Sequence, residues 1–385
     1  VCGFSAHPRE ADFKRWASEH PAKLSSLFPT LGKENVFPID LSVSSVLVGD
    51  REEANDLELF QFKIERLQKE VPERIIAGGY LEPRALYTSE AYDRTGNQGK
   101  ESRTIHMGVD FWIPAGTPVH ALFDGEVVFA VHDKGDKEYG GLIILKHREG
   151  DLDFYTLYGH QSLESVLKWK TGDRIAKGNL LSTLGNYPEN GNWAPHLHFQ
   201  LMLSLLDYQN DFPGVGYFNE LEVMKSICPD PGLLFGEAGL EAYRPADPSD
   251  TLAFRQKHLG RSLSLSYNEP LKIVRGDGVW LIDHMCRRYL DTVNNVAHVG
   301  HEHPRVVRAG QRQMAVLNTN TRYLHDQINA FARELLDTFP EKLSVVHLVN
   351  SGSEANELAL RMAFACTGQK DMLAVEVGYH GNTGG

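Results

Sequence analysis

The sequence predicts a multidomain chain, in which a mostly antiparallel β domain is followed by an α/β segment. Residues 75–245 contain short runs rich in Val, Ile, Leu, Phe and Tyr, and glycine-containing turns separate these runs, as in antiparallel all-β domains. Residues 246–385 carry apolar residues at helical spacing and then a continuous apolar run, which is typical of a helix next to a buried parallel strand. The length of 385 residues suits two or three domains.

Composition narrows the class of protein. The hydrophobic content of 42% is enough for packed cores, and the net charge of −12 argues against a nucleic-acid partner. We expect no membrane span, because no apolar run approaches the ~18 residues that a transmembrane helix needs. The first residues show neither an initiator Met nor a signal pattern, so we expect a fragment of a longer chain. The four cysteines are scattered, which favours reduced thiols and a cytoplasmic protein: Cys2, Cys228, Cys286 and Cys366.

Residues 1–74 are predicted to be a linker and helical segment without chemistry of its own. We expect a short helix over residues 10–19, and a capping box at Asp50–Glu53 before a second helix. That second helix is predicted to be one amphipathic helix that stops at Pro72 and packs on the next domain. Its apolar stripe is formed by Leu57, Phe60, Ile64, Leu67 and Val71.

The β domain, residues 75–245, contains five strand-like runs, at residues 127–130, 142–146, 154–158, 180–183 and 197–201. Residues 171–178 are predicted to form a tight hairpin before a buried strand. Residues 205–236 are predicted to be a loop, which either shapes a substrate groove or wraps the surface.

Histidines and a carboxylate in this domain suggest a metal site. His106 and Asp110 are four residues apart, and Gly108 between them permits the bend that brings them together. His196 and His198 are two residues apart in a strand-like run and therefore share a face. A catalytic zinc ion takes three protein ligands of these types and leaves one position for water.

His160, in Tyr158-Gly-His160, completes the set, so that three groups can bind metal and two imidazoles remain for the substrate. With 17 histidines in the chain, close pairs also arise by chance, and a lone His-x-His is more often an ordinary strand pair.

These motifs, with Pro114-Ala-Gly-Thr-Pro-Val119 after the first, resemble the lysostaphin-type (LytM-like) zinc metalloendopeptidases over residues 79–203. The resemblance implies that zinc binds three of the residues and that the other two are catalytic imidazoles. It also implies a peptide substrate, such as the cross-bridge of peptidoglycan. The ligands are then His106, Asp110 and His198, and the catalytic pair is His160 and His196.

The residue types suggest a separate chemical role for the zinc ion and for each of the two catalytic imidazoles. Zinc lowers the pKa of a bound water toward ~7. Either His160 or His196 then accepts the proton, and the other stabilises the oxyanion. The alternative is a zinc-binding fold that is catalytically idle.

Residues 246–385 are predicted to be helical around residues 324–339, with a buried parallel strand at Leu343–Val349. Ser351 and Glu354 then form a capping box for a helix that runs to Gly368. A strand, a Ser-Gly-Ser turn and a helix N-terminus can bind phosphate, although the same pattern can be a simple turn.

The segment from Leu263 onward resembles class III pyridoxal-phosphate aminotransferases, and in particular the branch with ethanolamine-phosphate phospho-lyases. The motifs are Arg275–Asp283, Tyr289–Pro304, Leu317–Asn320 and Asn350–Asn356.

The resemblance implies that Gly352 and Ser353 hold the phosphate of pyridoxal 5′-phosphate (PLP) and that Tyr379 stacks on its ring. It also places the Schiff-base lysine and the pyridine-facing aspartate beyond Gly385. We therefore predict an incomplete PLP-transferase fold, a partial cofactor site, no aminotransferase or lyase activity from these residues alone, and a homodimer only for the complete enzyme.

Two hypotheses follow. In the first, the chain is a zinc metalloendopeptidase fused to a truncated, inactive aminotransferase segment. In the second, the β domain is a zinc-binding regulatory module of a PLP-dependent aminotransferase or phospho-lyase.

Overall fold

The computed structural model describes residues 5–87, 92–96, 99–236, 238–263, 265, 267–294 and 296–383. It divides the chain into two compact units, residues 1–308 and 309–385, and each is described by itself. The boundaries after residues 74 and 245 stay a prediction. Three cysteines are free, namely Cys228, Cys286 and Cys366, while Cys2 lies outside the described residues.

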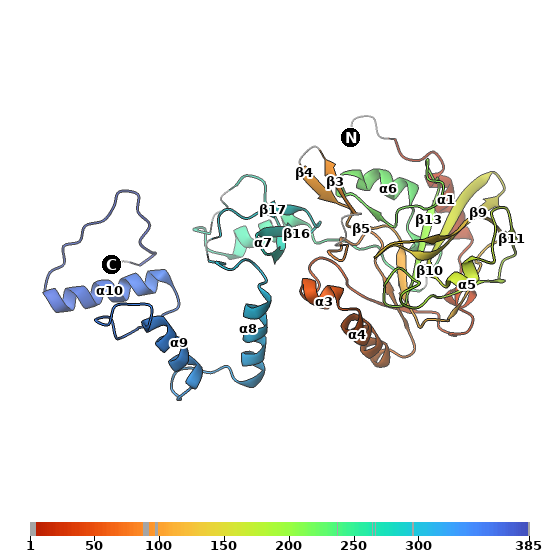
Figure 1. The fold of residues 1–385 in the computed structure, drawn as a ribbon. Helices are drawn as coiled ribbons and strands as arrows, with labels where there is room; N and C mark the ends of the chain where they lie inside the picture. The colour runs from red at the N-terminus through yellow and green to blue at the C-terminus, as the bar shows by residue number, and fades with distance from the viewer. Residues whose placement is uncertain are drawn as a thin grey trace. The chain divides into compact units, whose positions relative to one another are not determined.

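The first unit is built on an eight-stranded sheet in the order β1-β2-β6-β13-β10-β9-β8-β11 (Figure 1). Only the β1–β2 pair is parallel, so the predicted antiparallel β fold is confirmed. The strands are β1 (Val36–Pro38), β2 (Ile75–Gly78), β6 (Val109–Trp112), β8 (Gly125–Asp133), β9 (Gly140–Glu149), β10 (Leu152–Gln161), β11 (Arg174–Ile175) and β13 (Leu197–Met202).

Smaller strand pairs surround this sheet. They are β3 (Asp93–Gly96) with β4 (Gly99–Ser102), β5 (Ile105–His106) with β14 (Val215–Gly216), and β7 (Pro118–His120) with β12 (Leu180–Thr183).

The predicted hairpin over residues 171–178 is wrong, because β11 pairs with β8 whereas β12 pairs with β7. Backbone hydrogen bonds from Gly172 to Val127 and from Val127 to Asp173 fasten this turn to β8 instead.

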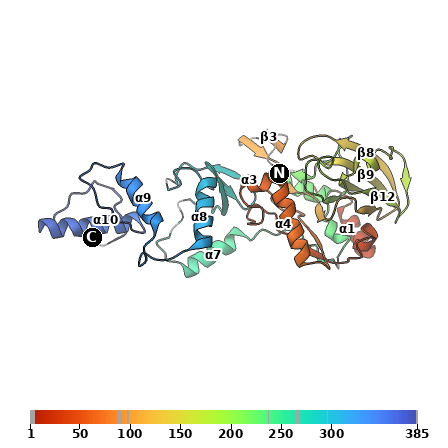
Figure 2. The same cartoon turned by 60° about the horizontal axis from the view of Figure 1, so that its bottom comes forward.

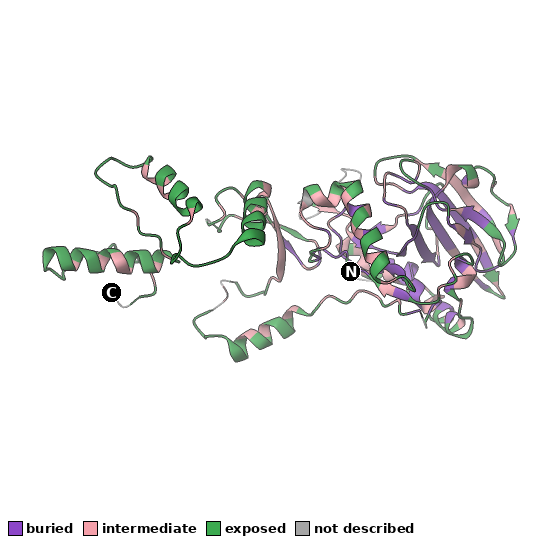
Figure 3. Ribbon diagram, turned by 90° about the horizontal axis from the view of Figure 1, so that it is seen from below, coloured by how far each residue is buried: buried purple, intermediate pink, exposed green. Residues whose placement is uncertain are grey.

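The N-terminal segment contributes helices and core residues to this unit. The helix predicted over residues 10–19 is confirmed as α1 (Glu10–Glu19), and α2 (Leu24–Leu27) follows it. Phe13 lies against Phe154, with 5.3 Å between ring centroids, and Phe28 lies against Phe111 at 5.4 Å. The central strands β6 and β13 of the main sheet are correspondingly buried (Figure 3).

The single helix predicted after Asp50 is wrong, because the structure has two: α3 (Arg51–Asn55) and α4 (Leu57–Glu70), next to each other in Figures 1 and 2. Asp50 caps α3 by accepting from the Glu53 N–H, as predicted, but Asp56 ends that helix and caps α4 through the Leu59 N–H. The stripe faces inward as expected, with Phe60 and Ile64 buried.

Residues 205–236 were predicted to be a loop, and this is wrong in part. They include a 3-10 helix η2 (Phe218–Glu220), α6 (Leu221–Ile227) and a second 3-10 turn η3 (Pro231–Leu233). Met224 and Ile227 of α6 join a buried cluster with Ile105 and Met107, which explains the helix in this segment. One further short helix, α5 (Leu163–Val166), follows β10.

The last part of the first unit is a helix and a three-stranded antiparallel meander: α7 (Pro248–His258), β15 (Ile273–Asp277), β16 (Trp280–Asp283) and β17 (Arg288–Leu290). Met285 from this meander joins the same buried cluster as Ile105. Arg275 donates to the backbone carbonyls of Val43 and Gly49, so the meander packs on the segment that precedes α3. The helix α8 (Pro304–Val316) begins at the end of this unit.

The second unit contains the predicted helices α9 (Asp326–Leu336) and α10 (Gly352–Thr367). Ser351 caps α10 through the Glu354 N–H, and Gly368 ends it with φ 66°, so the predicted cap and end are confirmed.

The buried strand predicted at Leu343–Val349 is wrong, since Val345 is 74% exposed and the segment forms no strand. A strand forms only beside another, and the described part of this unit offers none. No described helix in either unit combines the length and apolarity needed to cross a bilayer.

Candidate metal centre

His106 and Asp110 come together because the chain bends between β5 and β6. Gly108 lies at this bend, and a Cβ there would sit 2.7 Å from both His198 Nε2 and the Phe199 carbonyl oxygen. Only glycine leaves room for His198, which pairs directly with Asp110 in the β6–β13 register. The bend that the sequence predicted at Gly108 is therefore present, and it is required by close packing.

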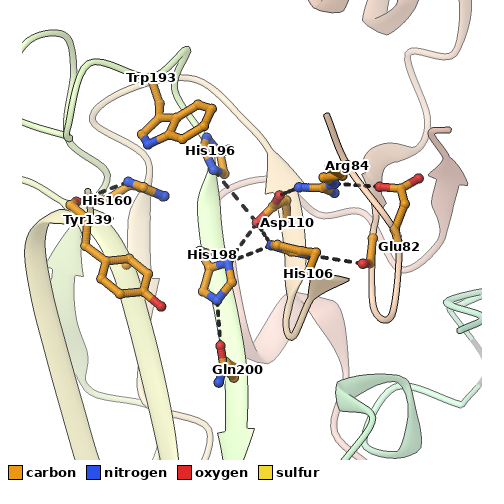
Figure 4. A network of polar contacts seen from close by, with 12 residues as sticks. Glu82, Arg84, His106, Asp110, Tyr139, His160, Trp193, His196, His198 and Gln200 are labelled. Atoms are coloured by element: carbon orange, nitrogen blue, oxygen red, sulfur yellow. Dashed lines mark hydrogen bonds and ion pairs between the residues drawn. The ribbon is translucent and has the colours of Figure 1, made fainter. Parts of the chain in front are cut away.

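Three ligand atoms form a compact triangle at this point (Figure 4). His106 Nε2 is 2.9 Å from His198 Nδ1 and 3.2 Å from Asp110 Oδ1, and His198 Nδ1 is 3.1 Å from Asp110 Oδ1. A tetrahedral zinc ion with bonds of about 2.0–2.1 Å separates its ligands by about 3.3 Å. The donor set therefore fits zinc in both chemistry and spacing.

Hydrogen bonds on the far side of each imidazole set its orientation. His106 Nδ1 donates to the Gly79 carbonyl at 3.0 Å, and His198 Nε2 donates to Gln200 Oε1 at 2.9 Å. With those protons fixed, the nitrogens that face Asp110 keep their lone pairs for a metal.

Asp110 is held by a buried chain of charges that the sequence interpretation missed. Arg84 Nη1 donates to Asp110 Oδ2 at 2.6 Å, and Arg84 Nε donates to Glu82 Oε2 at 2.6 Å. Glu82 Oε1 in turn accepts from the Leu41 N–H at 2.8 Å. The only sequence hint is a pair of charged residues inside the otherwise apolar stretch Gly79–Leu86.

Although burial opposes its ionisation, the charge of Arg84 helps to hold the pKa of the Asp110 carboxyl well below its usual range. Asp110 is therefore an anion with Oδ2 committed to Arg84 and Oδ1 turned toward the two imidazoles.

His160 and His196 lie beside the triangle. The β9–β10 register shifts between Tyr158 and Gln161, and His160 has a left-handed φ of 62°, so a β-bulge turns its ring toward the site. Its Nδ1 donates to the Asn190 carbonyl at 2.8 Å.

His196, just before β13, donates from Nδ1 to the Ala194 carbonyl at 2.8 Å, and its Nε2 is 3.8 Å from Asp110 Oδ1. The ring centroids of His160 and His196 are 4.3 Å apart. Each ring thus has its Nδ1 proton engaged, and Nε2 is the nitrogen available for chemistry.

Burial keeps the imidazoles neutral. It lowers the pKa of His106 to about 3 and of His196 to about 4, and it lowers the pKa of His160 well below its usual value. At neutral pH these three rings are therefore uncharged, and each has a lone pair that can bind a cation or accept a hydrogen bond from water.

A cavity of about 200 Å³ opens onto the five residues. Tyr139 and Trp193 contribute aromatic walls beside His160, with the Tyr139 hydroxyl donating to the Phe212 carbonyl at 3.1 Å. The structure thus brings together all five residues that the sequence singled out in this domain.

The residues predicted to bind PLP lie in the second unit and do not form a closed site. Gly352 and Ser353 open α10, and Ser353 Oγ accepts from the Asn382 N–H at 3.0 Å. Tyr379 is 77% exposed. The helix N-terminus suits a phosphate, but a ring stacked on Tyr379 would remain open to water, so these residues do not enclose PLP.

Two family models match the chain. Residues 104–209 match peptidase family M23, and residues 264–385 match class-III aminotransferases. The chain is therefore similar to a stretch of each of two enzyme families, as its motifs indicated.

The chain is also similar to parts of several known proteins. An alanine–glyoxylate aminotransferase 2-like protein of Drosophila melanogaster is 48% identical over 147 residues, which are 38% of this chain and 30% of that protein. The chain thus spans about a third or less of that relative.

Among solved structures, a phospholyase from Arthrobacter in complex with phosphoethanolamine is 46% identical, with a TM-score of 0.34, covering 35% of this chain and 32% of that one. The catalytic domain of the antimicrobial peptidase lysostaphin from Staphylococcus simulans is 26% identical, with a TM-score of 0.24, covering 39% of this chain and 92% of that one.

Proposed function

We propose that the β domain, residues 75–245, is a zinc metalloendopeptidase. The observation that carries this proposal is the buried triangle of donor atoms from His106, Asp110 and His198, with two further imidazoles beside it. The match to peptidase family M23 over residues 104–209 supports the same conclusion.

His106 Nε2, Asp110 Oδ1 and His198 Nδ1 would hold the zinc ion. When bound, zinc acts as a Lewis acid that polarises a carbonyl and makes water a nucleophile near neutral pH. The anionic Asp110 offsets part of the charge of the cation, and Arg84 keeps the second carboxylate oxygen away from it.

The two remaining imidazoles would move protons and bind the oxyanion. Each is neutral, because burial lowers its pKa, and each presents Nε2 while Nδ1 is held by a backbone carbonyl. One of His160 and His196 accepts the proton of the attacking water and returns it to the leaving amine. The other would stabilise the developing oxyanion, because a neutral imidazole can carry its proton on Nε2 as well as on Nδ1.

The substrate we propose is a peptide, and glycine-rich cross-bridge peptides of peptidoglycan are the first to test. The segment that matches class-III aminotransferases is proposed to have no aminotransferase or lyase activity by itself. The exposure of Tyr379 supports that proposal, because a cofactor ring stacked on this side chain would lie open to water.

Peptide cleavage by purified protein tests the proposal. The wild-type chain should cleave a glycine-rich peptide in the presence of zinc, and a chelator should abolish cleavage. His160→Ala and His196→Ala should each lower kcat/KM by about 100-fold or more and should still bind zinc. Unchanged cleavage in both variants would contradict the catalytic roles, whereas the absence of zinc from wild-type protein would contradict the site.

A further inference from the structure

The cavity beside the metal centre has one wall that the proposed chemistry does not use. Ala54, Leu57 and Phe60, from the corner between α3 and α4, line it. Leu86 and Trp112 continue the same apolar surface. The corner between α3 and α4 belongs to a part of the chain that precedes the family M23 match, which begins at residue 104.

This wall is continuous with the catalytic imidazoles. Trp112 lies between Phe60 and His196: its ring meets Phe60 edge-on, with centroids 5.2 Å apart, and stacks on His196 with centroids 4.2 Å apart. A substrate group that contacts this wall would therefore lie close to the catalytic His196.

Other residues that line the cavity are charged. Asp133, Lys134, Lys137 and Glu138 line it, all from the loop between β8 and β9 or its edges. A chain in the cavity would therefore meet charged side chains as well as the apolar wall. The wall favours an apolar group, because most of its surface is hydrocarbon.

The corner that forms the wall is fixed in place. Asp56 ends α3 and begins α4, and Lys63 Nζ donates to the Leu47 carbonyl at 3.0 Å and to Glu53 at 3.1 Å. The wall is thus pre-formed, as ligand pockets usually are.

We propose that this wall is a subsite for one bulky apolar side chain, of the leucine or phenylalanine class, next to the bond that is cleaved. The inference rests on the proposed peptidase function and narrows its substrate. A substrate with glycine at this position leaves the wall unused, whereas leucine buries its side chain there. Filling a hydrophobic pocket of this kind changes kcat/KM by about 10- to 200-fold.

The test is a set of quenched fluorescent peptides that differ at one position, scanned along the peptide, with Gly, Ala, Leu or Phe. For the wild-type chain with zinc, kcat/KM should be at least tenfold higher for Leu or Phe than for Gly at one position. Ala54→Trp should fill the subsite and remove this preference while leaving the glycine peptide within about twofold of wild type. Phe62→Ala is the matched control, because Phe62 is on α4, as Leu57 and Phe60 are, but is 60% exposed and does not line the cavity.

Equal rates for all four residues at every position, or equal losses for both peptides in Ala54→Trp, would overturn the subsite. Calorimetry measures peptide binding to chelator-treated wild-type protein, whose folding is checked by circular dichroism. It separates failure of the subsite proposal from failure of the peptidase proposal. Binding of the leucine peptide at least tenfold tighter than the glycine peptide, lost in Ala54→Trp, would support the subsite even if nothing is cleaved. Equal binding of the two peptides would exclude it.

Discussion

Replacing Arg84 with Met tests how the metal centre is held together. Arg84 Nη1 donates to Asp110 Oδ2, and Arg84 Nε donates to Glu82 Oε2, each at 2.6 Å. All three side chains are at most 3% exposed. Arg84→Met keeps an unbranched apolar stem but leaves two carboxylates buried without their cation.

Removing one partner of a buried ion pair costs about 3–5 kcal/mol, most of it because the remaining charge is unpaired. We expect the free energy of unfolding of zinc-free Arg84→Met to fall by about that amount. Zinc affinity should fall by about 10- to 100-fold, because Asp110 loses the group that orients it. Urea unfolding measures the first quantity and competition with a chelating dye measures the second.

Arg148→Met is the matched control. Arg148 makes an equally short ion pair with Asp153, at 2.6 Å, but its side chain is 67% exposed. That change should cost less than about 1 kcal/mol and leave zinc affinity unaltered. If Arg84→Met behaves like Arg148→Met in both assays, the buried charge chain has no part in forming the site.

Three further predictions follow from packing and burial. Gly108→Ala should abolish tight zinc binding, as judged by metal content after dialysis, because its Cβ would collide with His198 Nε2; wild-type content would refute the packing argument. Burial lowers the pKa of His147 to about 4, so the unfolded chain takes up this proton at a higher pH than the folded chain does. Stability should therefore be lost as the pH falls from about 6.5 to 4, by up to about 3 kcal/mol for this residue, and urea unfolding of His147→Gln should show a shallower decline than wild type. Arg275→Met should speed hydrogen exchange at residues 43–55, because it removes bonds to the carbonyls of Val43 and Gly49; unchanged exchange would show that the meander does not support this segment.

The sequence predicted the metal-site residues because metal chemistry restricts residue types and strand geometry restricts spacing. His196 and His198 share a face through the two-residue period of a strand. His106 and Asp110 can meet only if the chain bends between them, and the glycine at position 108 predicted that bend. All five residues lie together in the structure, and their individual roles stay predictions.

Arg84 and Glu82 could not be found in the same way. Each is a single charged residue, and neither belongs to a recurring pattern. Their partnership with Asp110 arises only when the chain after β2 folds back against β6, which adds contacts between residues 26 apart in the sequence. Long-range contacts of this kind leave no local periodicity to read.

The errors in the helices and strands have local and non-local causes. The start of α4 could have been predicted, because Asp56 is a good capping residue three positions before Leu59. The capping box at Asp50–Glu53 instead suggested the start of a single helix. Leu343–Val349 has the composition of a buried strand. Composition predicts burial only when neighbouring strands supply hydrogen bonds and apolar surface, and the described residues of the second unit do not.

The most direct test of the central claim is X-ray absorption at the zinc edge, combined with metal analysis. Wild-type protein should carry one zinc ion per chain, with nitrogen and oxygen ligands at about 2.0–2.1 Å that include two imidazoles. His160→Ala and His196→Ala should give the same spectrum, whereas His106→Ala and His198→Ala should lose the metal. Full zinc occupancy in His106→Ala and His198→Ala, or a spectrum dominated by sulfur ligands, would contradict the proposed metal centre.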